Sequence, residues 1–320
     1  MLITLSKMEL TERLKKRQRR KRLKILFFFV IIFFVIFSIY KISSLGKTTE
    51  ILNPLSESVE ILNKTMKNPL QKIAEKELFD QSIEYGIVVK NLKTGESYYK
   101  NEDQKFQTAS LYKLWAMGAT FEKISKGELS EKEVLKETIE DLNKKFDIAS
   151  EEAELTEGEV EKTVKEAMEK MIIISDNYSA LLLASRIGNL SLSTFLNKYD
   201  FTNSSIGSPP KSTAKDISGF FEKLYLGKLV SKKDSLQMIE ILKRQTLNDR
   251  IPKYLPENIS VAHKTGELDT VKHDAGIVFA KNGDYIIVVL SSSNNPIQTA
   301  ERIARFSEAV YKYFESRKLD

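Results

Sequence analysis

The sequence predicts an α/β fold of the α+β type, in which an antiparallel sheet is built from both ends of one domain and an all-helical lobe lies between. Strand patterns occur early, over 86–89 and 96–99, and late, over 263–265, 276–280 and 285–291. Between these two groups, apolar residues recur mainly at helical spacing. We therefore expect one sheet, a separate helical lobe and a binding cleft where the two meet.

Turn residues and helical periodicity place the remaining elements. The early strands are joined by a turn at 93–95 and the last two by Asn282 and Gly283, a hairpin signal. Helices are expected over 109–124, 129–146, 160–174, 179–187, 220–226 and 234–242, of which 129–146 is charged enough to be a solvated excursion. A final amphipathic helix is marked by Ile303, Phe306, Val310 and Phe314.

The composition limits the chemistry. The chain has 320 residues, no cysteine and two histidines. Disulfides, thiol catalysis and cysteine zinc sites are thereby excluded, and a histidine-rich metal site is not expected. We expect neither a metal nor an organic cofactor.

The positive charge is concentrated at the start of the chain. Residues 1–24 hold ten Lys or Arg and two Glu, a net charge of +8, whereas the whole chain carries +6, so residues 25–320 carry −2. A basic arm of this kind can bind nucleic acid. The apolar segment that follows favours another role, in which the basic residues set the orientation of a membrane segment. We therefore expect no nucleic-acid partner.

Residues 25–40 are apolar apart from Ser38, and the flanks extend the segment to residue 46. The positive cluster ahead of it predicts a cytoplasmic tail over 1–24, a single-pass transmembrane signal-anchor over 25–46 and a cell-membrane location. The alternative is a signal peptide cleaved near 44–46, but the apolar run exceeds the usual length of such a peptide.

Everything after the anchor is expected outside the cytoplasm. Residues 47–69 are a predicted tether with a short amphipathic helix, interrupted by Pro54 and Pro69. The catalytic domain is predicted over 70–320, as a monomer.

Ser110 and Lys113 form an S-x-x-K pattern that precedes a helical segment. At a helix start the two side chains share a face, and a desolvated lysine can serve as the base for a serine nucleophile. The alternative is that Ser110 caps the helix. The pattern alone is weak, because it recurs along the chain, with further cases that include Ser44, Ser97, Ser208 and Ser212. Of these, Ser212 also fits a helix cap.

Two further triplets strengthen the Ser110 pattern. Ser175-Asp176-Asn177 stands between two predicted helices, and Lys264-Thr265-Gly266 lies on a predicted strand. They follow Ser110 in the order SxxK, SDN, KTG, at separations of 65 and 89 residues. A second KTG at 93–95 lies in a hairpin turn, so the order and the elements carry the argument.

This combination resembles the penicillin-recognising serine hydrolases, specifically the class A β-lactamase-like family, over about residues 70–318. The resemblance implies a β-lactamase/transpeptidase-like fold in which Ser110 is the acylated nucleophile and Lys113 its base. Ser175 would relay a proton to the leaving nitrogen, and Lys264 would supply positive potential.

The resemblance also implies the substrate contacts. Asn177 would hold the amide side chain of the substrate, and Thr265 would bind its carboxylate. Gly266 and Glu267 are the remaining expected substrate-binding residues. The backbone N–H groups of Ser110 and Glu267 would form the oxyanion hole.

The chemistry required agrees with these residues and needs no histidine. A Ser-His-Asp triad would have to use His263 or His273. Strand alternation points His263 away from the side of Lys264, and His273 is expected to pack or hydrogen-bond.

The sequence departs from the family at the step that releases the acyl group. The family uses a glutamate in an E-x-x-L-N setting between SDN and KTG, and no such setting occurs here. Residues 200–221, where that loop is expected, offer only Asp200 and Asp216, and Asp216 is expected in a first helical turn.

We therefore expect a membrane-anchored serine hydrolase that is acylated on Ser110 by β-lactams or related amides and hydrolyses them. One alternative is a D,D-peptidase acting on cell-wall stem peptides. The other is a penicillin-binding sensor without turnover. The expected partners are a small β-lactam or cell-wall peptide substrate and the membrane.

Overall fold

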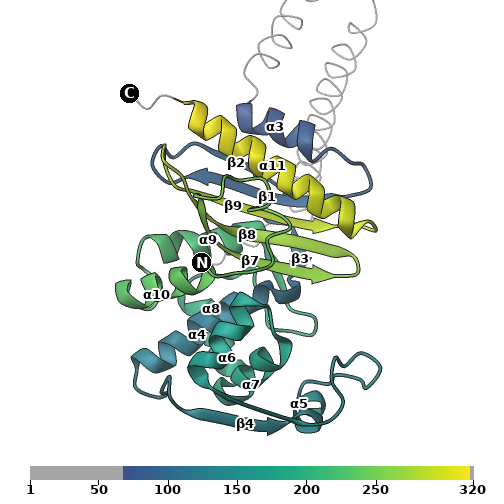
Figure 1. The fold of residues 1–320 in the computed structure, drawn as a ribbon, viewed down its shortest axis with the longest axis vertical. Helices are drawn as coiled ribbons and strands as arrows, with labels where there is room; N and C mark the ends of the chain where they lie inside the picture. The colour runs from purple at the N-terminus through teal and green to yellow at the C-terminus, as the bar shows by residue number, and fades with distance from the viewer. Residues whose placement is uncertain (1–67, 318–320) are drawn as a thin grey trace, which may run out of the picture. The chain divides into compact units, whose positions relative to one another are not determined.

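The computed structural model describes residues 68–317 (Figure 1). The cytoplasmic tail, the signal-anchor and nearly all of the tether lie outside the described residues, so they stay predictions. Within residues 68–317, no helix combines the length and apolar character needed to cross a membrane. Pro69 opens a helix rather than breaking one, because its missing N–H is not needed at a first helical position.

A five-stranded antiparallel sheet has the strand order β2-β1-β9-β8-β7 (Figure 1). Strand β1 pairs with β9 from Glu84–Ser292 to Asn91–Tyr285, which joins the two ends of the domain and confirms the predicted sheet. Strand β7 is the edge strand beside the helical lobe. The strands are β1 (Glu84–Asn91), β2 (Ser97–Lys100), β7 (Ser260–Leu268), β8 (Val271–Phe279) and β9 (Tyr285–Ser292).

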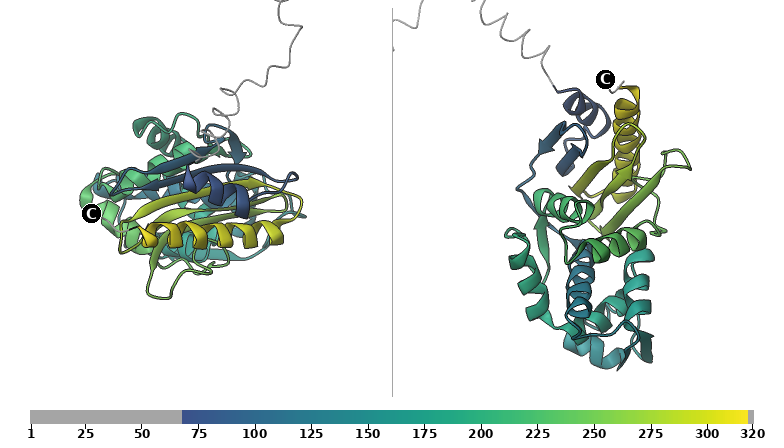
Figure 2. Two further views of the ribbon diagram at one scale, coloured as in Figure 1. Left: turned by 90° about the horizontal axis from the view of Figure 1, so that it is seen from above. Right: turned by 90° about the vertical axis from the view of Figure 1, so that its left-hand side faces the viewer.

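The central strands are apolar on both faces because both faces are covered. On β1, Ile87 and Val89 pack in one core with α3 (Pro69–Glu77) and α11 (Pro296–Ser316), which run side by side (Figure 2). Val88, between them, faces the other core, which the helical lobe shares. The sheet therefore has a helical layer on each side.

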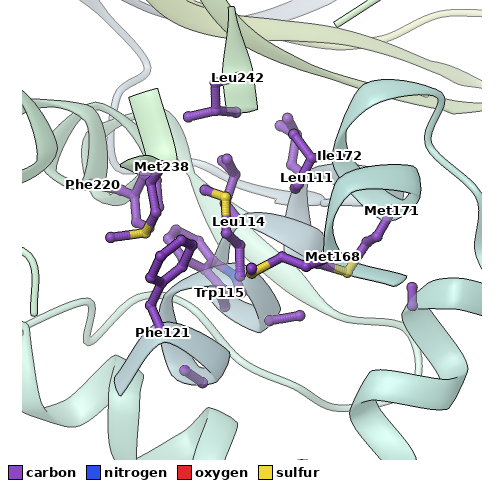
Figure 3. Close-up of a cluster of buried hydrophobic side chains, with 14 of the residues drawn as sticks. Leu111, Leu114, Trp115, Phe121, Met168, Met171, Ile172, Phe220, Met238 and Leu242 are labelled. Carbon is purple, nitrogen blue, oxygen red and sulfur yellow. The ribbon is translucent and has the colours of Figure 1, made fainter. Parts of the chain in front are cut away.

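The lobe is built around α4 (Lys113–Ser125), whose first ten residues are all buried. Trp115 stacks on Phe201 with ring centroids 5.2 Å apart and meets the edge of Phe220 at 5.4 Å. Figure 3 shows side chains of α4 meeting those of its neighbours. The surrounding helices are α5 (Ile139–Lys145), α6 (Val164–Ile173), α7 (Asn177–Ile187), α8 (Asn189–Lys198), α9 (Ala214–Tyr225) and α10 (Lys232–Leu242).

Two predicted helices each begin as a strand instead. The range 129–146 contains β4 (Val134–Thr138) before α5, and 160–174 contains the end of β5 (Glu159–Thr163) before α6. The two strands pair with each other, which the single-segment patterns could not indicate. Each ends in a threonine that caps the next helix, Thr138 on Asp141 N–H and Thr163 on Glu166 N–H.

Three short elements near Ser110 were not predicted. A 3₁₀ helix, η1 (Ala109–Tyr112), precedes α4. A two-stranded sheet pairs β3 (Lys105–Gln107) with β6 (Lys211–Thr213), and so binds the segment ahead of Ser110 to the loop ahead of α9. Ser212 lies in β6, and Thr213, not Ser212, caps α9.

Candidate active site

Ser110 lies in η1, between the sheet and the lobe. Ala109 has a φ of +45°, an uncommon value for a residue with a side chain, and this turn directs the chain from β3 into η1. Neither η1 nor α4 has a side-chain cap, so the alternative that Ser110 caps the helix is wrong. Ser110 is partly exposed, and no described residue hydrogen-bonds its hydroxyl.

Lys113 is the first residue of α4 and is fully buried. Its Nζ donates to Ser175 O at 2.6 Å, to Ser175 Oγ at 3.3 Å and to Asn177 Oδ1 at 2.6 Å. Burial lowers the pKa of Lys113 to about 8, against the opposing charges of Asp176 and Glu154. Lys113 is thus available as a base near neutral pH.

Ser175 stands between α6 and α7 with a φ of +60°, in the left-handed region. The next residue, Asp176, caps α7 by accepting a bond from Ser179 N at 2.6 Å. Asn177 is the first residue of α7. The tight connection therefore presents Ser175 and Asn177 together to Lys113.

Lys264 reaches the same hydroxyl from the sheet. Its Nζ donates to Ser175 Oγ at 2.9 Å and to Thr265 O at 2.9 Å. Burial holds the pKa of Lys264 well below its usual range, and the charge of Lys113 adds to this effect, whereas that of Asp274 opposes it. The three predicted motifs thus meet at one oxygen atom, Ser175 Oγ.

Gly266 lets β7 approach η1. A Cβ at this position would lie 2.8 Å from Thr108 O and 3.2 Å from Leu111 Cγ, closer than ordinary packing allows. The KTG strand therefore runs directly beside the turn that carries Ser110. Thr265 is 2% exposed on the same strand.

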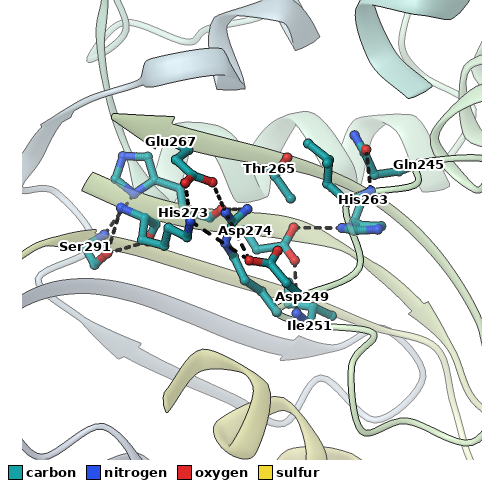
Figure 4. Close-up of polar contacts among 12 residues, drawn as sticks. Gln245, Asp249, Ile251, His263, Thr265, Glu267, His273, Asp274 and Ser291 are labelled. Carbon is teal, nitrogen blue, oxygen red and sulfur yellow. Dashed lines mark hydrogen bonds and ion pairs between the residues drawn. The ribbon is translucent and has the colours of Figure 1, made fainter. Parts of the chain in front are cut away.

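The side chain of Glu267 belongs to a cluster of polar contacts (Figure 4), and it forms an ion pair with Arg250. Glu267 accepts bonds from Arg250, whose Nη2 is 2.5 Å from Oε2, and from Lys272. Although burial pushes the pKa of Glu267 up, the bond from Lys272 and the charge of Arg250 hold it below its usual value.

Arg250 is a site-adjacent residue that the sequence interpretation missed. It is 1% exposed, donates to His273 O at 3.4 Å and has an Nε without a partner among the described residues. Arginine is seldom fully buried, so the sequence carried little signal beyond its place ahead of the KTG strand.

Both histidines are structural, as predicted. His263 Nδ1 lies 2.8 Å from Asp274 Oδ1, and Figure 4 shows the two side chains facing each other. His273 Nε2 donates to Gln107 O at 2.8 Å while its Nδ1 accepts from Ser291 N at 3.0 Å. Burial lowers the pKa of His273 to about 4, so it is neutral.

The loop ahead of α9 offers no free carboxylate near the site. Residues 201–212 contain neither Asp nor Glu. Asp216 does lie in the first turn of α9, as predicted, and its Oδ2 accepts bonds from Asn203 N at 2.9 Å and Ser204 Oγ at 2.8 Å. This carboxylate therefore fastens the loop to the helix.

Glu154 is a second residue that the sequence interpretation missed. It lies in the loop between α5 and β5, and its Oε1 accepts a bond of 2.5 Å from Asn177 Nδ2. The loop is rich in glutamate, so nothing in the pattern distinguished Glu154 from its neighbours.

Comparisons with known proteins identify the family. The model of the beta-lactamase enzyme family matches residues 66–314. Beta-lactamase VEB-1 of Pseudomonas aeruginosa is 26% identical over 255 residues, which cover 72% of this chain and 85% of that protein.

Two solved structures share the fold. The structure of PBP-A has a TM-score of 0.68 at 24% identity and covers 79% of this chain and 97% of its own. A beta-lactamase from Sphaerobacter thermophilus has a TM-score of 0.68 at 20% identity and covers 78% and 98%. Because the family model spans most of the chain, the protein belongs to the beta-lactamase enzyme family and is a serine hydrolase of that family.

Proposed function

We propose that this protein is a membrane-anchored serine hydrolase that faces the outside of the cell and is acylated by β-lactams on Ser110. The observation that carries the proposal is the meeting of Lys113 and Lys264 at Ser175 Oγ. A nucleophile, a base, a proton relay and a cation are the groups that opening a cyclic amide beside a carboxylate requires.

Acylation then proceeds by proton transfers among these groups. Ser110 Oγ attacks the lactam carbonyl carbon while its proton passes to neutral Lys113, whose pKa of about 8 leaves a useful neutral fraction near pH 7. The C–N bond breaks as Ser175 gives its proton to the ring nitrogen. Ser175 recovers a proton from Lys113, which hydrogen-bonds it. The product is an ester on Ser110.

The substrate is held on both sides of this bond. Backbone N–H groups of Ser110 and Glu267 receive the oxyanion, since Gly266 brings the strand beside η1. Thr265 and Lys264 take the carboxylate, and Asn177 takes the amide of the acyl side chain.

The fate of the acyl-enzyme separates two candidate functions. Hydrolysis by water makes the protein a β-lactamase. A D,D-peptidase that β-lactams inhibit is the second candidate, and one observation favours it: residues 201–212 offer no carboxylate to activate water, and Asp216 is bound to Asn203 and Ser204.

One experiment tests both steps. The full chain, purified in detergent, is incubated with a chromogenic cephalosporin while intact mass and colour are followed together. Colour beyond one equivalent supports a β-lactamase. A lasting adduct on Ser110 with one equivalent of colour supports the peptidase or a sensor. Absence of any adduct contradicts the proposal, and Ser110→Ala is the control that should never be labelled.

The location is tested separately, because it rests on residues 1–46 alone. The apolar segment and the basic residues ahead of it support an anchor with a cytoplasmic start. We expect the full chain in the membrane fraction, and digestion of its domain by protease added to spheroplasts. Extraction by alkaline carbonate, or protection from the protease, would contradict the anchor or its orientation. The monomeric state also stays a prediction.

A further inference from the structure

We propose that Glu154 makes the acylation site select substrates that carry a positive charge beside the amide of their acyl side chain. The inference rests on the proposed function of Ser110. Its starting point is the bond of 2.5 Å between Asn177 Nδ2 and Glu154 Oε1. The carboxylate of Glu154 thus contacts the side-chain amide of Asn177, which we assign to bind the acyl side chain of the substrate.

The amide of Asn177 is held at both of its polar atoms. Oδ1 accepts from Lys113 Nζ at 2.6 Å, so the amide group faces away from Lys113 with its Nδ2 donors. A substrate carbonyl that binds Nδ2 comes to lie next to the carboxylate of Glu154. A cation two bonds beyond that carbonyl would meet an attractive charge there, and an anion would meet a repulsive one.

The loop that carries Glu154 is held beside Asn177 by contacts that do not involve the charge of Glu154. The adjacent residue, Leu155, is tied to the lobe through its backbone: its N–H donates to Tyr178 Oη at 3.2 Å, and its carbonyl accepts from Asn143 Nδ2 at 2.8 Å. Tyr178 is buried on α7 immediately after Asn177. Removing the charge of Glu154 should therefore leave the loop in place.

Glu154 is exposed, so its effect is that of a partly screened charge. Exposed ion pairs are worth at most about 1 kcal/mol, which corresponds to about a fivefold change in rate for one charge. A cationic side chain should gain up to about fivefold and an anionic one should lose a similar factor. The effect should shrink in high salt.

Three penicillins that differ in one substituent test whether Glu154 selects for side-chain charge. Benzylpenicillin has hydrogen, ampicillin an ammonium and carbenicillin a carboxylate at the carbon next to the side-chain amide. Acylation rate constants of the full chain are measured by intact mass at low salt, at about pH 6, where the ammonium is protonated. We expect the order ampicillin, benzylpenicillin, carbenicillin, from fastest to slowest. Glu154→Gln should bring the three within about twofold, and Glu154→Lys should reverse the order.

Glu157→Gln is the matched control, because it removes the same charge from an exposed position of the same loop. It should keep the wild-type order. If Glu154→Gln keeps that order too, or slows all three penicillins equally, Glu154 has only a structural role and the inference is wrong while the proposed function stands. If no penicillin labels the wild-type chain, the proposed function fails and the inference with it.

Discussion

Lys264 Nζ donates to Ser175 Oγ at 2.9 Å, and this bond joins the edge strand of the sheet to the loop ahead of α7. Lys113 donates to the same oxygen from α4 at 3.3 Å. Burial is the main reason why the pKa of Lys264 lies well below its usual range, and the charge of the neighbouring Lys113 lowers it further. The two lysines thus oppose each other's positive charge around the oxygen that we propose as the proton relay.

Ser175→Ala should slow acylation strongly without unfolding the domain. It removes the proton relay and one acceptor of each lysine, and loss of a positioned acid or base costs about 10²- to 10⁴-fold. The measurement is the rate of adduct formation with benzylpenicillin. Ser179→Ala is the matched control, because its buried hydroxyl has no partner among the described residues and it lies in the first turn of α7, four residues after Ser175. Equal rates for both variants would exclude Ser175 from the reaction.

The acylation rate should rise with pH and level off above about pH 8. Lys113 must be neutral to accept the proton of Ser110, and its pKa is lowered to about 8. Below that value each unit of pH should cost about tenfold, because the neutral fraction falls tenfold. The check is a pH profile of adduct formation, with circular dichroism to show that the fold persists. A rate independent of pH between about 6 and 8 would rule out Lys113 as the base.

Two glycine substitutions should have opposite effects on stability. A Cβ on Gly118 in α4 would lie 2.2 Å from the ring of Phe195, so Gly118→Ala overpacks the lobe and should cost about 1–3 kcal/mol. A Cβ on Gly219 in α9 would meet Phe201 at an ordinary 3.6 Å. Gly219→Ala should therefore stabilise by up to about 1 kcal/mol, since alanine favours a helix. Urea unfolding measures both, and a stable Gly118→Ala variant would show that Phe195 can move.

The sequence predicted most features that follow from the order of the motifs along the chain and from the periodicity of apolar residues. The motif order correctly brought Lys113, Ser175 and Lys264 together, and the paired β1 and β9 confirmed a sheet built from both ends. Their catalytic roles stay predictions. Strands β4 and β5 were missed because each buries only one residue, Leu135 or Val160, which is too few to set a period of two.

Arg250 and Glu154 were missed for a different reason. Their importance comes from partners that are distant in sequence, Glu267 and Asn177 respectively. The burial of an arginine, or the contact of one glutamate among many, follows from tertiary packing and leaves no local pattern. Only the folded chain distinguishes these two residues from the other charged residues.

Asp216→Ala should weaken the fold and leave the lifetime of the acyl-enzyme unchanged. Its carboxylate accepts bonds from the partly buried Asn203 N and Ser204 Oγ, and losing a hydrogen bond to a charged group costs about 1.5–3 kcal/mol. Asp234→Ala is the matched control, at the same position of α10, where the carboxylate bonds only its own cap, Ser231. Unfolding in urea should show the larger loss for Asp216→Ala. Intact mass after removal of free benzylpenicillin gives the lifetime, and a longer-lived adduct in Asp216→Ala alone would instead identify Asp216 as the base that releases the acyl group.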